Sequence, residues 1–316
     1  MQCNLFLNGG GTRLAVYLGG LKMLEEHGVE VTAWSGASAG SLVASVMASG
    51  YSLDQAFELM LHTDYRQFLD IRPLKMIRDF GLCSGAAFER WLDGVLDGRR
   101  FRDLDVPFSV VCTNVTTGQP LIFSNENTPE AKVATAVRGS IGIPGVFGVH
   151  RVDGNALIDG TLTVVEPEML FPNMTLPSFL IRMASNRSAP MERRDKFGLT
   201  GYLRRIIEIM LRCTDDLCQP ELWSHDLCLT TGAHSPIRFG MSAEDKHELH
   251  HSGYLQCQRY VRNFLPRDLS DCCEMASTLS SEEIASRDGH IKAPIDMHLV
   301  SNCSKTMEGF SSGVNF

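Results

Sequence analysis

The sequence predicts an α/β fold in which helices cover a largely parallel sheet. Two strand–turn–helix units follow one another at the start of the chain, and glycines mark both turns. In the first unit the apolar residues 5–7 end at Gly9, and leucines then recur at helical spacing. In the second unit the stretch 31–34 ends at Gly36, and residues 41–49 alternate small and apolar side chains. Successive units of this kind place their strands in parallel, because each helix carries the chain back between them.

The remaining elements follow in chain order. Ser52, with Gln55 three residues later, has the pattern of a capping box and predicts a helix start. Pro129 at a first turn favours a helix over 129–138, and residues 199–211 have the clearest amphipathic pattern in the chain. Short apolar runs predict further strands at 108–112, 121–123, 157–158 and 179–183.

The periodic pattern fades beyond residue 265. Ser, Asp, Glu and Cys dominate residues 266–316, and no long helical or strand pattern survives there. We therefore expect one folded domain over residues 1–265 and a polar, loosely ordered C-terminal tail over residues 266–316.

Composition and charge exclude several functions. The chain has 316 residues, of which 44% are hydrophobic and 21% charged, and its net charge is −8. An acidic chain without a basic block lacks the phosphate contacts on which nucleic-acid binding rests, so we expect no nucleic-acid partner. The ten cysteines show no C-x-x-C pair and no zinc spacing, so we expect no metal and reduced thiols. Residues 1–4 lack the basic start of a secretory signal, which favours a cytoplasmic location.

A G-x-S-x-G pattern stands between the second expected strand and its helix. A serine at the centre of such a turn has its Oγ lifted out of the sheet, and small neighbours let the two backbones approach. This pattern makes Ser38 a candidate nucleophile, with Gly36 and Gly40 as its elbow. The N–H of Ala39, at the start of the helix, is placed to stabilise an oxyanion.

A second glycine turn, Gly9, Gly10 and Gly11, precedes Thr12 and Arg13. Consecutive glycines free the backbone to direct several N–H groups at one anionic oxygen, which suits an oxyanion hole for acyl transfer. A nucleotide phosphate loop fits less well, because position 14 is not glycine and no G-K-[S/T] follows. Three roles are open to Arg13: support of the loop, contact with a lipid phosphate, or an ordinary place on the helix surface.

The general base is less obvious from the residues alone. His150 lies in an expected loop with no clear acidic partner, and most other histidines fall in the polar C-terminal third. Asp159 ends the short strand 157–158 and precedes Gly160, so its carboxylate is expected at a sheet edge. A carboxylate hydrogen-bonded to a serine can act as a general base when burial raises its pKa. The alternative is a plain turn aspartate, which is common before glycine.

In their order and spacing, residues 9–13, 36–40 and 159–160 resemble the patatin-like phospholipase family. Residues 101–107 and 140–147 and the region 239–265 carry further similarity to that family. The resemblance covers roughly residues 3–265 and is strongest before residue 165.

This resemblance implies a three-layer α/β/α fold with a mostly parallel central sheet, and a serine hydrolase that needs no cofactor. Ser38 would be the nucleophile and Asp159 the base, together a Ser-Asp dyad with an acyl-serine intermediate. The oxyanion hole would be built from Gly9, Gly10, Gly11, Thr12 and Ala39.

Two positions depart from the family pattern. Thr161 stands where the family commonly has glycine or alanine after Asp-Gly, and Val165 stands where an asparagine often lies two residues before Pro167. Both positions flank the dyad, so they bear on substrate fit and loop support more than on activity itself.

We expect a phospholipase A-type enzyme that cleaves acyl esters of glycerophospholipids and acts peripherally at membranes. A lipase or thioesterase on neutral or soluble acyl esters is one alternative, and a non-catalytic relative that binds lipid or a partner is another. Residues 71–82 and 197–212 mix apolar side chains with Lys and Arg and are candidates for the membrane contact. The second segment is equally explained as a helix that covers the sheet. The acyl chain, the headgroup, the need for a protein or small-molecule activator, and the oligomeric state stay open.

Overall fold

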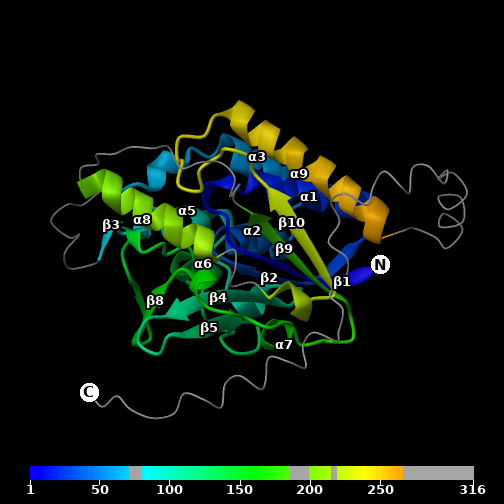
Figure 1. Ribbon diagram of the computed structural model, residues 1–316. Helices are drawn as coiled ribbons and strands as arrows, with labels where there is room; N and C mark the ends of the chain where they lie inside the picture. Colours follow the sequence, from blue (N-terminus) through cyan, green and yellow to red (C-terminus); the bar gives the residue numbers. More distant parts are fainter. Residues whose placement is uncertain (71–79, 185–198, 215–218, 266–316) are drawn as a thin grey trace, which may run out of the picture. The chain divides into compact units, whose positions relative to one another are not determined.

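The computed structural model describes residues 1–70, 80–184, 199–214 and 219–265 (Figure 1). The expected tail over residues 266–316 lies outside the described residues, and so does most of the candidate membrane segment 71–82. Within the described ranges, every helix is too short or too polar to cross a lipid bilayer.

The central feature is one sheet whose middle strands are parallel. Its strands are β1 (Gln2–Leu7), β2 (Glu30–Ala37), β4 (Phe108–Asn114), β5 (Gln119–Ser124), β7 (His150–Val152), β8 (Asn155–Ile158), β9 (Ser178–Ala184) and β10 (His225–Thr230). They lie in the order β10-β9-β1-β2-β4-β8-β7, and β5 also pairs with β4. The pairs from β10 to β4 are parallel, whereas β5, β7 and β8 run antiparallel to their partners. The expected α/β fold with a largely parallel sheet is therefore confirmed.

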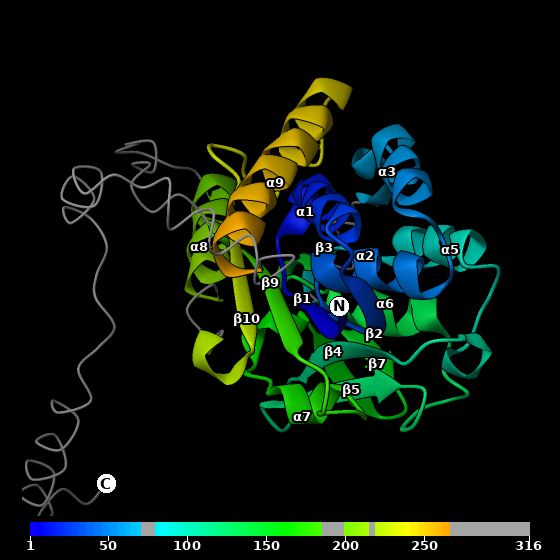
Figure 2. The same cartoon turned by 90° about the vertical axis from the view of Figure 1, so that its right-hand side faces the viewer.

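Helices lie on both faces of this sheet (Figure 2). The helices are α1 (Ala15–Glu26), α2 (Ala39–Ala48), α3 (Leu53–His62), α5 (Ala86–Val95), α6 (Val133–Ser140), α7 (Pro167–Leu170), α8 (Leu199–Thr214) and α9 (Ala243–Phe264). In Figure 2, α1, α2, α3 and α9 lie above the sheet and α7 lies below it. A Cβ on Gly19 of α1 would lie 1.8 Å from the carbonyl oxygen of His250, and one on Gly253 of α9 would lie 2.0 Å from that of Val16. These two glycines therefore let α1 and α9 cross with their backbones in close contact.

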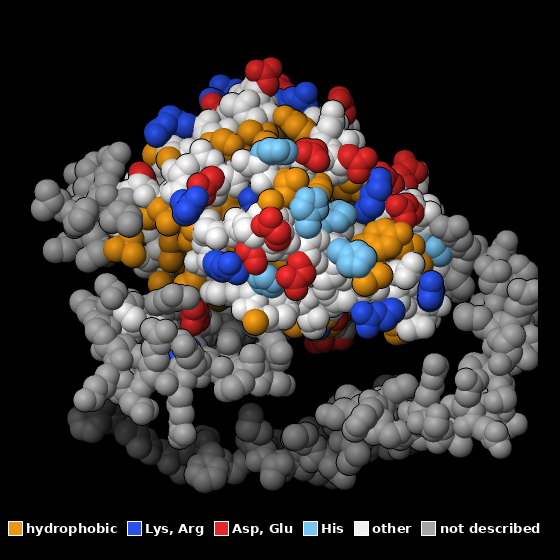
Figure 3. Space-filling view, turned by 90° about the horizontal axis from the view of Figure 1, so that it is seen from above, with side chains coloured by type: hydrophobic (Ala, Val, Ile, Leu, Met, Phe, Trp, Pro, Cys, Tyr) orange, Lys and Arg blue, Asp and Glu red, His pale blue; other side chains and the backbone are white. Residues whose placement is uncertain are grey.

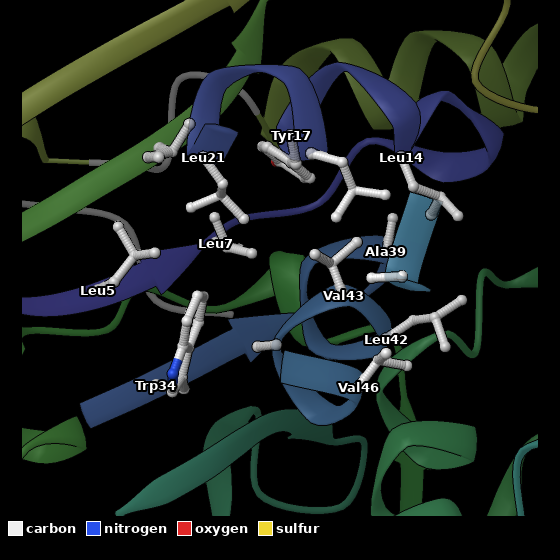
Figure 4. Packing of buried hydrophobic residues seen from close by; sticks show 14 of the residues in the cluster. Leu5, Leu7, Leu14, Tyr17, Leu21, Trp34, Ala39, Leu42, Val43 and Val46 are labelled. Carbon is white, nitrogen blue, oxygen red and sulfur yellow. The ribbon is translucent and has the colours of Figure 1, made fainter. Parts of the chain in front are cut away.

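The main hydrophobic core fills the space between these helices and the sheet (Figure 4). Leu5 and Leu7 of β1 are fully buried there, and so are Leu18 of α1 and Val43 of α2. A second cluster closes the opposite face, where Trp223 stacks on Phe6 of β1 with ring centroids 5.3 Å apart. The sheet is thus buried on both faces, as a parallel sheet requires.

Several element boundaries differ from the sequence-based expectations. The capping box at Ser52 is confirmed, with both of its hydrogen bonds to Gln55 present. The helix expected from Pro129 begins instead at Val133, because Lys132 is extended and pairs with Arg100 in an isolated antiparallel bridge. Strand β10, at an outer edge of the sheet, was not expected, although its Leu227 and Leu229 are buried in the main core.

The topology collects three loops at one end of the sheet. The glycine turn at residues 9–11 follows β1, Ser38 follows β2, and Asp159 follows β8. Because β1 and β2 are parallel neighbours, the first two loops emerge side by side at the carboxyl ends of their strands. The third approaches through the pairing of β8 with β4.

Candidate active site

Ser38 occupies a sharp turn between β2 and α2. Its backbone has φ 51° and ψ −127°, a conformation that L-residues rarely adopt. Glycines on both sides make the turn possible. A Cβ on Gly36 would lie 2.5 Å from the Cα of Ser41, and one on Gly40 would lie 2.0 Å from the carbonyl oxygen of Leu7. The backbone strain at Ser38 is thus held in place by the packing of the strand against the helix.

The side chains of Ser38 and Asp159 meet in a buried contact. Ser38 Oγ donates a hydrogen bond to Asp159 Oδ2 over 2.7 Å, and Asp159 has no solvent exposure. The other carboxylate oxygen, Oδ1, accepts from the backbone N–H of Thr161 at 3.0 Å and from its hydroxyl at 2.7 Å. Burial raises the pKa of Asp159 above its ordinary value, and the hydrogen bonds from Thr161 and Ser38 offset part of that rise.

Ser140, at the end of α6, fixes the turn from the other side. Its Oγ accepts the backbone N–H of Ser38 at 2.8 Å and donates to the carbonyl of Val111 on β4 at 2.5 Å. Thr113 of the same strand donates from Oγ1 to the carbonyl of Asp159 at 2.8 Å. Strand β4 therefore holds both halves of the Ser38–Asp159 pair.

The glycine turn at residues 9–11 lies beside Ser38. Not all of the N–H groups in and after this turn are free to bind an oxyanion. Thr12 donates its N–H to the carbonyl of Pro236 over 2.9 Å, so this group is not available to an oxyanion. The expectation for Thr12 is corrected on this point. In the described ranges, the N–H groups of Gly9, Gly10, Gly11 and Ala39 donate to no other residue. Those groups are the open donors beside Ser38.

Arg13 lies beneath this turn. It is 3% exposed, so the interpretation as a helix-surface arginine is wrong. Its Nε donates to the carbonyl of Gly10 at 2.9 Å, and its Nη1 donates to the hydroxyl of Thr231 at 2.7 Å. The burial and these two contacts favour support of the loop over contact with a lipid phosphate.

An apolar pocket opens beside Ser38. The space beside Ser38, counted together with the open solvent at its mouth, is about 510 Å³. Besides Ser38, Ala39 and residues of the glycine turn, its lining consists of Leu14, Leu42, Tyr65, Phe68, Phe88, Ile141, Ile143, Phe147, Pro236 and Phe239. Such a lining suits a hydrocarbon chain attached to the group that Ser38 would attack.

Comparison with known protein families identifies the chain. The family model described as patatin-like phospholipase matches residues 5–169, which include both glycine turns, Ser38 and Asp159. The chain belongs to the patatin-like phospholipase family. Membership places it among lipid hydrolases.

Relatives within the patatin-like phospholipases differ widely in length. YqhO of Bacillus subtilis (strain 168) is 30% identical in an alignment of 229 residues that covers 62% of this chain and 77% of YqhO. The NTE family protein Rv1063c of Mycobacterium tuberculosis is 29% identical over 161 residues, 49% of this chain and 41% of that protein. Lysophospholipase NTE1 of Mycosarcoma maydis is 26% identical over 51% of this chain, but these residues are only 8% of that protein.

A solved structure shares the fold of this chain. VipD from Legionella pneumophila superposes with a TM-score of 0.55 at 18% identity, over 83% of this chain and 67% of VipD. At this level of identity the likeness shows the fold alone.

The two departures from the patatin-like pattern have different environments. Val165 is 9% exposed and packs in the cluster that closes the second face of the sheet, beside Val111 and Leu170. An apolar side chain therefore suits this position. Thr161 instead contacts the carboxylate of Asp159 directly.

Sequence reasoning missed several residues that complete the patatin-like site. Ser140 lies in a segment that carried the family resemblance, but nothing in the sequence indicated its contact with Ser38. Tyr17 donates from its hydroxyl towards the carbonyls of Asn8 and Gly9, and Pro236 fixes Thr12. The contacts of Ser140 with Ser38 and of Pro236 with Thr12 link residues far apart in the chain, so no local pattern could have revealed them.

Proposed function

We propose that this protein hydrolyses acyl esters of glycerophospholipids as a phospholipase A-type enzyme, with Ser38 as nucleophile and Asp159 as general base. The observation that carries the proposal is the 2.7 Å hydrogen bond from Ser38 Oγ to the buried carboxylate of Asp159. The apolar pocket beside this bond supports an acyl substrate.

The reaction proceeds in two halves. Asp159 takes the proton of Ser38 Oγ as that oxygen attacks the acyl carbonyl, and the N–H groups of Gly10, Gly11 and Ala39 stabilise the oxyanion. The intermediate collapses to an acyl-serine, and the departing alcohol takes the proton from Asp159. Water then attacks the acyl-serine, Asp159 accepts its proton, and the fatty acid leaves as Ser38 regains a proton. A raised pKa suits Asp159 to this role, because the carboxylate then binds the proton more readily.

We also propose that α8 provides contact with a membrane surface. Tyr202, Ile206 and Ile209 are 52%, 45% and 44% exposed, and their spacing places them in one row along the helix. In Figure 3, hydrophobic side chains gather at the left, where Figure 1 places β3 (Gly81–Cys83) and α8.

The inner side of α8 faces the pocket. Ile207 and Met210 pack with Ile143 and Phe147, two residues of the pocket lining. The sequence of α8 contains three arginines and one glutamate, in contrast to the net charge of −8 for the chain. A helix with an apolar row and a basic sequence suits an anionic lipid surface.

Labelling with a fluorophosphonate probe, followed by peptide mapping, tests the nucleophile without requiring the right lipid. We expect label on Ser38, loss of label in Ser38→Ala, and a loss of at least about 1,000-fold in labelling rate for Asp159→Asn. Ser45→Ala is the matched control, because Ser45 is a buried serine of α2 that donates only to the carbonyl of Leu42. An unlabelled wild-type protein would favour a non-catalytic lipid-binding relative.

Substrate class needs a separate comparison. We expect the purified protein to release fatty acid from phosphatidylcholine or phosphatidylglycerol vesicles faster than from triacylglycerol emulsions or acyl thioesters. If the order of rates were reversed and Ser38 were still labelled, the protein would be a serine hydrolase, but a lipase or thioesterase and not a phospholipase.

A further inference from the structure

Thr161 contacts both parts of the site and has no assigned role. We infer that Thr161 is a positioning residue that holds the carboxylate of Asp159 for proton transfer and, with its methyl group, sets the place of the glycine turn. The inference rests on the proposed function for its kinetic consequences, whereas the contacts of Thr161 with Asp159 and with the glycine turn do not depend on that function.

Thr161 fixes the orientation of the Asp159 carboxylate. Asp159 Oδ1 accepts two hydrogen bonds, both from Thr161, while Oδ2 accepts the hydroxyl of Ser38. Rotation of the carboxylate about its Cβ–Cγ bond would break both contacts at Oδ1. Thr161 therefore fixes the plane in which Oδ2 meets the nucleophile.

Thr161 also affects the proton affinity of Asp159. Burial raises its pKa, and the N–H and the hydroxyl of Thr161 are the strongest groups that lower it, ahead of the hydroxyl of Ser38. A hydrogen bond donated to a carboxylate favours the ionised form, which is the form that takes a proton from Ser38. The hydroxyl of Thr161 therefore helps to keep the base ionised.

Neighbouring charged groups do not replace this effect. Burial raises the pKa of Cys112 on β4 far above its usual range and lowers that of His150 on β7 to about 4, so both are neutral near pH 7. Arg138 of α6 donates to the carbonyls of Ser84 and Gly148, and Arg13 donates to Gly10 and Thr231, not to Asp159.

The methyl group of Thr161 contacts the glycine turn. A Cβ on Gly9 would lie 2.4 Å from Cγ2 of Thr161 and 3.3 Å from Cβ of Ser38. The methyl group therefore packs directly against the backbone of the glycine turn. One side chain thus contacts the base through its hydroxyl and the glycine turn through its methyl group.

Three substitutions separate these contacts. Thr161→Val keeps the shape and removes the hydroxyl, Thr161→Ser keeps the hydroxyl and removes the methyl group, and Thr161→Ala removes both. The readout is the pH profile of fluorophosphonate labelling and of soluble ester hydrolysis. The rising limb reports ionisation of Asp159, so we expect its midpoint to move to higher pH by about one unit in Thr161→Val and Thr161→Ala. Thr161→Ser should keep the wild-type midpoint.

A matched control removes a different hydrogen bond to the same residue. Thr113 donates its hydroxyl to the backbone carbonyl of Asp159 and is itself buried. Thr113→Val should lower the melting temperature without moving the pH midpoint. A Thr161→Val profile that coincides with the wild-type profile, or a shift of equal size in Thr113→Val, would overturn the inference.

A direct titration keeps the test independent of activity. The ¹³C signal of the Asp159 carboxyl, identified by its absence in Asp159→Asn, is followed with pH in the wild-type protein and in Thr161→Val. We expect the midpoint to rise in the variant even if the wild-type protein hydrolyses no ester. Equal midpoints would refute the role of Thr161, whereas a shifted midpoint without any labelling of Ser38 would refute only the proposed function.

The methyl contact has its own test. Gly9→Ala should destabilise the wild-type protein strongly and the Thr161→Ser protein much less, because only the wild-type protein carries Cγ2 in that space. Thermal unfolding of the four proteins of this double-mutant cycle measures the difference. Equal losses of melting temperature in both backgrounds would show that the methyl group does not set the place of the turn.

Discussion

The backbone N–H of Ser38 donates to Oγ of Ser140 over 2.8 Å, and the same oxygen donates onward to the carbonyl of Val111. Ser38 has a positive φ of 51°, which costs an L-residue on the order of 1–3 kcal/mol. The contact with Ser140 ties this strained turn to the central strand β4. The turn at Ser38 is therefore held by a hydroxyl from a segment 102 residues away in the chain.

Ser140→Ala should slow labelling of Ser38 by about 100-fold, because loss of the hydroxyl frees the turn to shift and displaces Oγ from Asp159. Labelling rates measured alongside thermal unfolding test this expectation. Ser45→Ala again serves as control, since it removes a buried hydroxyl of α2 that does not touch the pair. Equal labelling rates in Ser140→Ala and wild type would show that the turn is held by backbone packing alone.

Asp159→Asn should raise the melting temperature at pH 7 by a few degrees while it abolishes hydrolysis. Burial raises the pKa of Asp159 in the folded state, so the folded state holds its proton up to a higher pH than the unfolded state does. Ionised Asp159 therefore costs stability at neutral pH, and this cost vanishes below about pH 4, where both states are protonated. The gain from Asp159→Asn should shrink as the pH falls. Melting curves across this range, with Ser38→Ala for comparison, would contradict the expectation if the gain grew on acidification.

Gly11→Ala should be far more damaging than Gly118→Ala. Both glycines have positive φ, 61° and 69°. A Cβ on Gly118 meets nothing within 4 Å, whereas one on Gly11 would lie 1.9 Å from the carbonyl oxygen of Pro236. Gly118→Ala should cost about 1 kcal/mol from backbone strain alone. Gly11→Ala should add a displacement of Pro236 and a large loss of labelling. Similar unfolding and labelling in both variants would count against the fit between the glycine turn and Pro236.

Ile206→Glu and Ile209→Glu should each weaken binding to anionic phospholipid vesicles by about tenfold, because each removes an apolar side chain from the membrane contact. Cosedimentation with vesicles measures this binding. Leu255→Glu on α9 is the matched control, because Leu255 is 38% exposed on another helix. Labelling of Ser38 without vesicles should stay at the wild-type rate in all three variants. If Leu255→Glu lost as much vesicle binding, the exposed row of α8 would not be a specific membrane contact. The same would follow if the substitutions on α8 dissociated a dimer and left vesicle binding unchanged.

The fold was largely predictable because its first units carry local signals. The runs at 5–7 and 31–34 became β1 and β2, and the capping box at Ser52 opens α3. Local pattern misled at Pro129, where pairing of Lys132 with Arg100 outweighs the helical preference. Strand β10 escaped prediction although buried Leu227 and Leu229 alternate with less buried residues along it, because two apolar positions in a six-residue strand are a weak signal.

Local sequence patterns likewise indicated some residues of the candidate site and not others. Ser38 and the glycines carry strong local constraints, since sharp turns and close backbone approaches restrict the residue type. The signal for Asp159 was weaker, because its place at the end of the strand 157–158 and before Gly160 suited a general base or a plain turn aspartate, and the family resemblance favoured the base. The environment of Thr12 could not be predicted, because its partner Pro236 lies 224 residues away in the sequence.

The sequence by itself determined the α/β fold, the place of the turns and the family of lipid hydrolases. These properties depend on periodicity and on short motifs, which are formed by residues close together in the sequence. Only the tertiary structure decided which N–H groups stay open, that Arg13 lies inside, and that Thr161 and Ser140 hydrogen-bond to Asp159 and Ser38. Those properties depend on contacts between distant segments, and a hydrogen bond or a buried charge is fixed by the three-dimensional packing around it.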